Sequence, residues 1–344
     1  MNQLGNETNS SNGFMPAVTT FISTSTESGK MGGRAGRIRL YLNRMFPPAA
    51  TVPYLLAYAL AAHLGLQALA GQTPLRLTWR ACAAAVSVFL FGLLLRVYDE
   101  LKDADSDRVL AADGDPRYRD RPIVTGEVTE EDLRTLRNLV IVALFALNLP
   151  IGFPFAVPGF LATFGVVWLS SRWFFWKAIS RHLLLAFATH NPIPLVLLAY
   201  VGAIYTQDFG TTGLGSQGIA LLIGLWLPWT AWETSRKIRI PADETNYQTY
   251  SKILGWRVAA LVPASCVVAS LALLAPVLRA AGLGEWPIAV LSASAALVVL
   301  SCLRFQFWPS RLRARLRPFV DVYGTAVNLG IVIGLTVSHG LRFP

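Results

Sequence analysis

The sequence FLFGLLLRVYDELKDADSD, residues 89–107, joins the end of an apolar segment to a run of acidic side chains. Read as one helix, it places Glu100, Asp103 and Asp107 at positions i, i+3 and i+7, with Asp99 four residues before Asp103. Carboxylates on one helical face repel one another unless a cation lies between them. Mg²⁺ is commonly held by one or two carboxylates together with the phosphate oxygens of a substrate. The run therefore predicts a site for Mg²⁺ and a diphosphate at the membrane edge; the alternative is a solvated acidic helix end.

The composition is that of a membrane protein. Hydrophobic residues make up 53% of the 344 residues, charged residues make up 15%, and the mean hydropathy is +0.46. We therefore expect an all-α, polytopic membrane protein with its helices around a central cavity. Nine apolar stretches reach or approach the length that spans a bilayer, at about 50–71, 81–98, 135–154, 157–176, 182–206, 217–235, 256–278, 286–303 and 319–340. They divide the chain into a disordered polar tail, 1–36, and a nine-helix transmembrane domain, 37–344.

The positive charges orient the predicted helices. The net charge is +10, and if all nine stretches span the bilayer, 26 of the 30 Lys and Arg residues fall on the side of the N-terminus. The positive-inside rule makes this side cytoplasmic. We expect an integral, multi-pass protein of a bacterial inner or plasma membrane, with its N-terminus and charged loops in the cytoplasm. The basic residues then orient the protein in the membrane and attract anionic lipid and substrate. Nucleic acid is therefore not an expected partner.

The loop after the acidic run carries two further candidates. The guanidinium groups of Arg119 and Arg121 are suited to clamping phosphate oxygens in a bidentate manner. The alternative is that they pair with the neighbouring aspartates. Thr129 and Asp132 predict a cap for the helix that follows.

Aromatic and polar residues mark the fourth and fifth stretches. Trp173 and Lys177 have the i, i+4 spacing that would bring an aromatic face beside an ammonium group, although such aromatics also form interfacial belts. His190 and Asn191 precede Pro192 near the middle of the fifth stretch. Polar groups at that depth indicate either an internal pocket or a structural kink.

A second charged cluster follows the sixth stretch. It begins with Glu233, Arg236 and Lys237 and continues to Asp243 and Glu244. Together with the first cluster, it suggests two halves that face one cavity. The later basic run from Arg311 to Arg317 is expected to be a lipid-facing anchor.

These motifs resemble those of the intramembrane aromatic prenyltransferase superfamily, the UbiA family, over about residues 40–340. The family motif NDxxDxxxD is similar to the pattern formed by Asp99, Glu100, Asp103 and Asp107. The family loop KxRPLxSG is similar to the segment from Arg119 to Gly126, and the family element YxxxK is similar to Trp173-x-x-x-Lys177.

The second acidic motif of the family, DxxxD, is altered in this chain. Glu233 is followed four residues later by Lys237, where the resemblance would require a carboxylate. Two alternatives stay open. Either Lys237 and Arg236 neutralise a diphosphate directly, or Asp243 and Glu244 fold back to hold a metal ion.

The resemblance implies Mg²⁺-dependent transfer of a prenyl group from a polyprenyl diphosphate to an aromatic or other lipophilic acceptor within the membrane. Glu100, Asp103 and Asp107 would hold Mg²⁺ and act in catalysis with Lys177. The implied substrate contacts are Asp99, Arg119, Arg121, Trp173, His190, Asn191, Glu233, Arg236, Lys237 and Asp243. Expected partners are the diphosphate, the hydrophobic acceptor and membrane lipid. A terpene cyclase on the same scaffold and a non-catalytic lipid-binding or transport protein are the alternatives.

Overall fold

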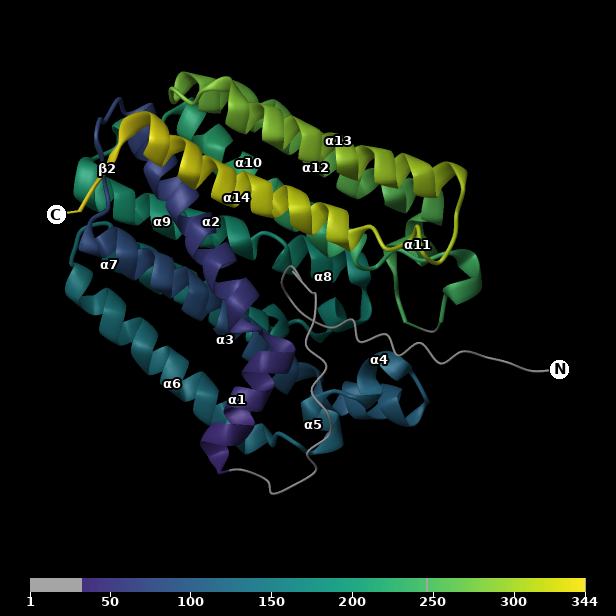
Figure 1. The fold of residues 1–344 in the computed structure, drawn as a ribbon. Coiled ribbons are helices and arrows are strands. Elements are labelled where there is room, and N and C mark those ends of the chain that lie inside the picture. Colours follow the sequence, from purple (N-terminus) through teal and green to yellow (C-terminus); the bar gives the residue numbers. More distant parts are fainter. Residues whose placement is uncertain (1–32, 246, 344) are drawn as a thin grey trace. The chain divides into compact units, whose positions relative to one another are not determined.

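A computed structural model describes residues 33–245 and 247–343, which are almost entirely helical (Figure 1). The predicted disordered tail lies largely outside the described residues. By internal packing the chain divides into two compact units. Unit 1 comprises Met1–Val52 and Leu90–Phe145, and unit 2 comprises Pro53–Phe89 and Ala146–Pro344.

Unit 1 contains the N-terminal helix, the acidic run and the loop that follows it. Its elements are α1 (Arg34–Met45), the start of α2 (Pro48–Leu69), the C-terminal two thirds of α3 (Trp79–Ala112), α4 (Pro116–Arg119), α5 (Pro122–Thr125) and most of α6 (Glu130–Asn148).

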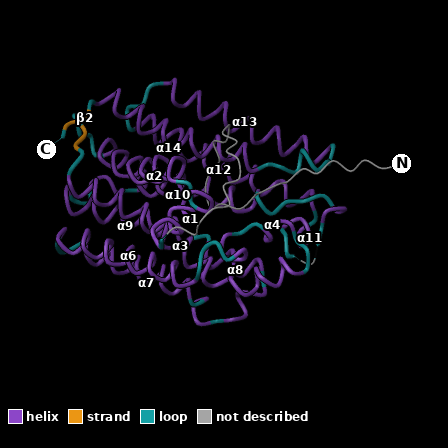
Figure 2. Tube along the Cα trace, turned by 60° about the horizontal axis from the view of Figure 1, so that its bottom comes forward, coloured by secondary structure: helices purple, strands orange, loops and turns teal. Residues whose placement is uncertain are grey.

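Unit 2 contains the remaining helices. After the rest of α2, α3 and α6, its elements are β1 (Leu75–Arg76), η1 (Leu149–Ile151), α7 (Ala156–Ser171), η2 (Trp173–Phe175), η3 (Lys177–Arg181), α8 (Leu183–His190), α9 (Ile193–Phe209), η4 (Thr212–Leu214), α10 (Ser216–Ser235), η5 (Pro241–Asp243), α11 (Tyr250–Leu254), α12 (Trp256–Ala280), α13 (Glu285–Phe307), α14 (Arg317–His339) and β2 (Leu341–Arg342). The two short strands pair in parallel, and Figure 2 shows them in orange close to the C-terminus.

The all-α, polytopic class is confirmed. In the described part of the chain, seven helices are long and apolar enough to cross a membrane, and the protein is accordingly an integral, multi-pass membrane protein. The predicted count of nine is not confirmed. The fourth predicted stretch corresponds to α7, a shorter apolar helix, and the sixth corresponds to α10, which is not among the seven.

The length of α3 explains how an acidic run continues a membrane helix. Its 34 residues extend about 51 Å at 1.5 Å per residue, whereas the hydrocarbon core of a bilayer is about 30 Å thick. The apolar N-terminal part is sufficient to cross that core. The last turns, which carry the acidic run, therefore extend beyond it.

In unit 1, ion pairs fix the amphipathic helix α1 to the start of α6. Arg37 donates two hydrogen bonds of 2.7 Å to the two carboxylate oxygens of Asp132. Asp132 also accepts from the backbone N–H of Thr129 at 3.0 Å and from its hydroxyl at 2.8 Å, and its own N–H bonds that hydroxyl in return. The predicted cap is thus present, and the same carboxylate holds α1.

In unit 2, α10, α12, α13 and α14 lie side by side (Figure 1). Gly224 lets α10 pack closely on α12. A Cβ at this position would lie 2.7 Å from the side chain of Leu274, and the Gly224 carbonyl accepts a 2.7 Å hydrogen bond from Ser270. A larger residue would force Leu274 to move, so these contacts hold α10 against α12 about two and a half turns before Glu233.

We predict that Arg37→Met detaches α1 from unit 1, because Asp132 loses its bidentate partner. Limited proteolysis of the protein in detergent micelles is expected to cleave near residue 45 several-fold faster than in the wild type. Arg39→Met is the matched control, since Arg39 is exposed on the same helix. Equal cleavage rates for the two variants would contradict the role assigned to Arg37.

Candidate active site

The acidic run forms a largely buried face of α3 in unit 1. Glu100 and Asp107 are 1% and 3% exposed, and Asp103 is half-buried. By contrast, the side chain of Asp105 is 98% exposed. Charged residues are seldom buried to this extent unless they are paired. The predicted face therefore exists, and it is not a solvated helix end.

Fixed cations accompany most of these carboxylates. Arg96 Nη2 lies 2.7 Å from Glu100 Oε2, one turn earlier on α3, and Lys102 Nζ lies 2.9 Å from Asp99 Oδ1. Asp107 pairs with Arg121 from the following loop. Asp103 lies within electrostatic range of Asp99, Lys102 and Asp107.

One buried oxygen in this cluster lacks a partner. Glu100 Oε1 forms no hydrogen bond with any described residue, although its burial removes it from water. An unpaired buried carboxylate oxygen is costly, and a cation that reaches it would remove that cost. Within the described residues, no three His, Cys, Asp or Glu side chains converge enough to hold a metal ion by themselves. Mg²⁺ needs fewer protein ligands when substrate phosphates complete its shell, so these residues fit it in that form.

The loop after α3 presents Arg121 toward the acidic face. Asp115 caps α4 by accepting from the backbone N–H of Arg117 at 3.1 Å, and the adjacent Arg117 side chain holds the pKa of Asp115 below its usual value. The Arg121 guanidinium lies 4.5 Å from the ring centroid of Tyr118, in cation–π geometry. Arg119, the other predicted phosphate clamp, is exposed. Of the two predicted clamps, Arg121 thus shows the alternative in which the guanidinium group pairs with an aspartate, because it forms an ion pair with Asp107.

In unit 2, the kink predicted near Pro192 is present between α8, which ends at His190, and α9, which begins at Ile193. The Thr230 hydroxyl donates a 2.8 Å hydrogen bond to Asn191 Oδ1, and Trp226 Nε1 donates a 2.9 Å bond to the Asn191 carbonyl. His190 packs edge-on against Trp173 and Phe174, with centroid distances of 5.2 and 5.4 Å. These polar groups thus join α8 to α10 and to the turn that precedes α8.

The predicted helical pairing of Trp173 with Lys177 is wrong. Helix α7 ends at Ser171, and residues 173–175 have φ values of 51°, 48° and 60° in the left-handed region. Non-glycine residues rarely adopt this conformation, so the chain turns here instead of continuing a helix. Lys177 begins the short helix η3 and is exposed. Spacing by four residues therefore does not bring the two side chains onto one face.

The end of α10 carries a carboxylate with two cationic partners. Glu233 Oε2 accepts a 2.6 Å hydrogen bond from Arg236, and Glu233 Oε1 lies 2.9 Å from Lys237 Nζ. Asp243 pairs at 2.8 Å with Arg311. Glu244 accepts hydrogen bonds of 2.7 and 2.6 Å from Thr249 and Ser251, and so it fixes the loop before α11.

Aromatic rings surround this end of α10. Trp232 is buried, with the guanidinium groups of Arg236 and Arg317 lying 5.1 and 5.3 Å from its ring centroid. Trp229 contacts Tyr54 and Tyr58 edge-on at 5.5 and 5.6 Å. Electron-rich faces of this kind stabilise positive charge.

Comparison with protein families matches residues 50–321 to the UbiA prenyltransferase family. The chain belongs to this family. No curated protein matches it.

Among solved structures, the apo structure of a UbiA homolog from Aeropyrum pernix K1 is 21% identical, with a TM-score of 0.60 over 83% of this chain and 98% of that one. A structure of digeranylgeranylglyceryl phosphate synthase is 14% identical, with a TM-score of 0.51 over 87% and 98% of the two chains. At these low sequence identities, both similarities show a shared fold and nothing about activity.

Several residues of this UbiA-family protein that contact the site residues were not predicted from sequence. Arg96 was detectable, because it lies four residues before Glu100 on the same helix. Arg317 was assigned to a lipid anchor, yet its side chain is only 20% exposed, stacks on Trp232 and lies 3.5 Å from Asp321. Its contact with a helix more than 80 residues earlier leaves no signal in local spacing.

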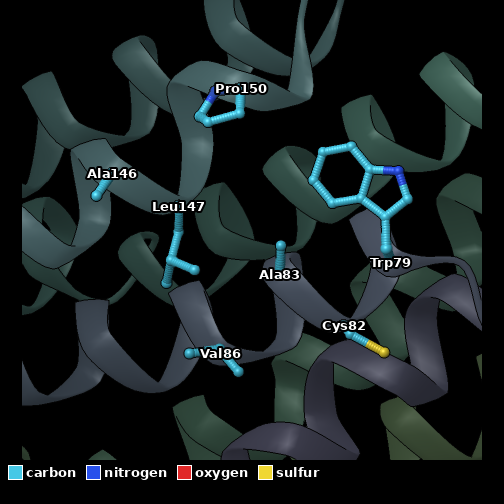
Figure 3. A pocket seen from close by; sticks show the side chains of 7 residues that line it. All are labelled: Trp79, Cys82, Ala83, Val86, Ala146, Leu147 and Pro150. Carbon is cyan, nitrogen blue, oxygen red and sulfur yellow. The ribbon is translucent and has the colours of Figure 1, made fainter.

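A hollow of about 400 Å³ opens on the apolar surface of unit 2, at the opposite end of α3 from the acidic run. Figure 3 shows its lining, which comes from the start of α3 and the end of α6 with η1: Trp79, Cys82, Ala83, Val86, Ala146, Leu147 and Pro150. None of the predicted site residues lines it. An apolar concavity in a membrane helix pair is suited to lipid chains and has no groups for diphosphate chemistry.

We predict that the Thr230–Asn191 hydrogen bond stabilises the junction of α8 and α9 in this UbiA-family protein. A double-mutant cycle with Asn191→Ala and Thr230→Val is expected to give a coupling free energy of about 0.5–1.5 kcal/mol in reversible unfolding. Coupling close to zero would show that the two side chains act independently.

Proposed function

We propose that this protein transfers a prenyl group from a polyprenyl diphosphate to a lipophilic acceptor within the membrane, with Mg²⁺ bound at the acidic run. The observation that carries the proposal is the buried Glu100 carboxylate, one oxygen of which has no hydrogen-bond partner in the described part of the chain, on the same face as Asp103 and Asp107. Membership of a family of prenyltransferases supports the reaction class.

Glu100, Asp103 and Asp107 are the residues assigned to the metal. Mg²⁺, when bound, neutralises the charge that develops on a departing diphosphate. Arg121 is assigned to the diphosphate oxygens, because its guanidinium lies beside Asp107 and is held by the Tyr118 ring. Asp99 is assigned to positioning through its pair with Lys102.

Unit 2 is assigned two roles of its own. The aromatic faces of Trp229 and Trp232 are suited to stabilise an allylic cation after the diphosphate departs. His190, Asn191 and Trp173 are assigned to the substrate, and Lys177, at an exposed position, remains a proposed catalytic residue. In unit 1, the exposed Arg119 remains a proposed substrate contact. An acceptor ring carbon then captures the cation and loses its proton to the departed diphosphate, so no nucleophilic side chain of the protein is needed.

We also infer that the N-terminus and both charged clusters face the cytoplasm. The support is the distribution of charge: if all nine predicted stretches span the bilayer, 26 of the 30 basic residues fall on one side. We also propose that residues 37–344 form the catalytic membrane domain.

We expect Asp103→Asn to lower Mg²⁺-dependent pyrophosphate release from geranyl diphosphate and an aromatic acceptor by at least about 100-fold, because the charge facing the metal is lost. The measurement uses the purified full chain in nanodiscs. Asp105→Asn is the matched control: it lies two residues away, points to solvent and is expected to retain wild-type activity.

Wild-type activity in the Asp103→Asn variant would refute the metal assignment. Product analysis by mass spectrometry tests the reaction class. A prenylated acceptor supports transfer, whereas a cyclic hydrocarbon formed without any acceptor would identify a terpene cyclase. Absence of pyrophosphate release with a panel of prenyl diphosphates would favour a non-catalytic lipid-binding protein.

A further inference from the structure

The C-terminal end of α10 does not fit a metal ion. Both oxygens of Glu233 are taken, one by Arg236 at 2.6 Å and the other by Lys237 at 2.9 Å. A divalent ion at this carboxylate would have to displace two cations and then lie beside the Lys237 ammonium group. Like charges at such short range repel strongly, and Mg²⁺ needs oxygen ligands that a lysine cannot supply.

The two acidic residues further along the loop do not replace the missing carboxylate. Asp243 is paired at 2.8 Å with Arg311. Glu244 uses both carboxylate oxygens to accept from Thr249 and Ser251. Releasing Glu244 would break contacts that hold the loop between α10 and α11, and releasing Asp243 would break its pair with Arg311 from the segment after α13. The alternative in which they fold back to hold a metal is therefore disfavoured by the contacts they already make.

The same end of α10 carries an excess of positive charge. Three cations, Arg236, Lys237 and Arg317, face two carboxylates, Glu233 and Asp321, which leaves one positive charge. The two guanidinium groups are held by cation–π contact with the Trp232 ring, at 5.1 and 5.3 Å. Because they are pre-positioned, little side-chain entropy is lost when they bind an anion.

A buried donor beside these cations is unused. The Tyr250 ring lies 5.9 Å from Lys237 Nζ, and its residue is 2% exposed. Its hydroxyl forms no hydrogen bond with any residue in the described ranges. Burial, with the nearby Glu233 carboxylate, raises the pKa of this hydroxyl above its ordinary value, so the group keeps its proton. A retained O–H that lacks an acceptor is suited to an incoming oxyanion.

We propose that the Glu233–Lys237 end of α10 binds a phosphate or diphosphate group directly, without a metal ion, through Lys237, Arg236 and Arg317. Glu233 acts as a positioning residue that holds two of these cations. This proposal rests on the proposed function in one respect: the proposed function supplies the prenyl diphosphate as the source of the anion. Its consequence is that, of the two charged clusters in the described residues, the acidic run of α3 binds metal ions and the end of α10 does not.

The first test measures anion binding without metal. Inorganic pyrophosphate is titrated into the full chain in nanodiscs with EDTA present, by calorimetry. Lys237→Met and Arg317→Met are each expected to weaken binding about tenfold or more, because each loses a charge-assisted contact. Arg315→Met removes an exposed charge two residues from Arg317 and is expected to bind like the wild type. Lys237→Arg keeps the charge and is expected to retain most of the affinity.

The second test counts metal ions. Mn²⁺ bound in the presence of pyrophosphate is titrated by electron paramagnetic resonance. Glu233→Gln is expected to leave the wild-type number of ions unchanged, whereas Lys237→Asp, which restores a carboxylate pair, is expected to add one ion. Loss of an ion in Glu233→Gln would overturn the proposal, as would metal-free binding that is insensitive to both Lys237→Met and Arg317→Met.

Further measurements identify the source of the anion and distinguish this proposal from the proposed function. Tighter binding of geranyl thiodiphosphate than of pyrophosphate, with equal losses in the variants, identifies the prenyl donor. Inorganic phosphate that binds as tightly, and is not displaced by geranyl thiodiphosphate, identifies a phosphate-bearing acceptor. If turnover is absent but binding depends on Lys237 and Arg317, the proposed function fails while this site stands. If the protein turns over substrate but its anion binding does not change in Lys237→Met and Arg317→Met, this site is overturned while the proposed function stands.

Discussion

The arrangement of this protein depends on neutralising carboxylates that are buried at the ends of membrane helices. Glu100 is almost fully enclosed, and it is tolerated because Arg96 lies one turn away on the same helix. Breaking a buried ion pair by removing one partner costs about 3–5 kcal/mol, so neither residue is replaceable by itself. Asp107 and Arg121 repeat the arrangement between α3 and the next loop.

The two charged clusters differ in what remains unsatisfied. In unit 1, an oxygen of Glu100 has no partner among the described residues, so the cluster lacks positive charge at that point. In unit 2, both oxygens of Glu233 are occupied, and the neighbouring Tyr250 hydroxyl is a donor that makes no hydrogen bond with the described residues. The first cluster is complementary to a cation and the second to an anion. Lys237, whose ammonium group takes one oxygen of Glu233, accounts for much of this difference.

Much of the fold was predictable from the sequence. The length of the apolar segments predicted the helices. The spacing of Glu100, Asp103 and Asp107 predicted a shared helical face, which is largely buried in the structure. Local capping rules placed Thr129 and Asp132 correctly. Local rules failed at residues 173–175, where the left-handed backbone conformation follows from packing against α8 and not from composition. They also failed for Arg317, because its partner Trp232 is brought to it only by the tertiary packing of α14 on α10.

The glycine contact between α10 and α12 bears on how the Glu233 cluster meets its ligand. At Gly224 a side chain would clash with Leu274 of α12, and Ser270 bonds the α10 backbone there. Sliding or rotating α10 would break that contact, so the end of the helix that precedes Arg236 and Lys237 is fixed against α12. Selectivity among ligands then arises from the match between the spacing of these two cations and the separation of the oxyanions, as in a rigid template, and does not require closure of the helix around the bound anion.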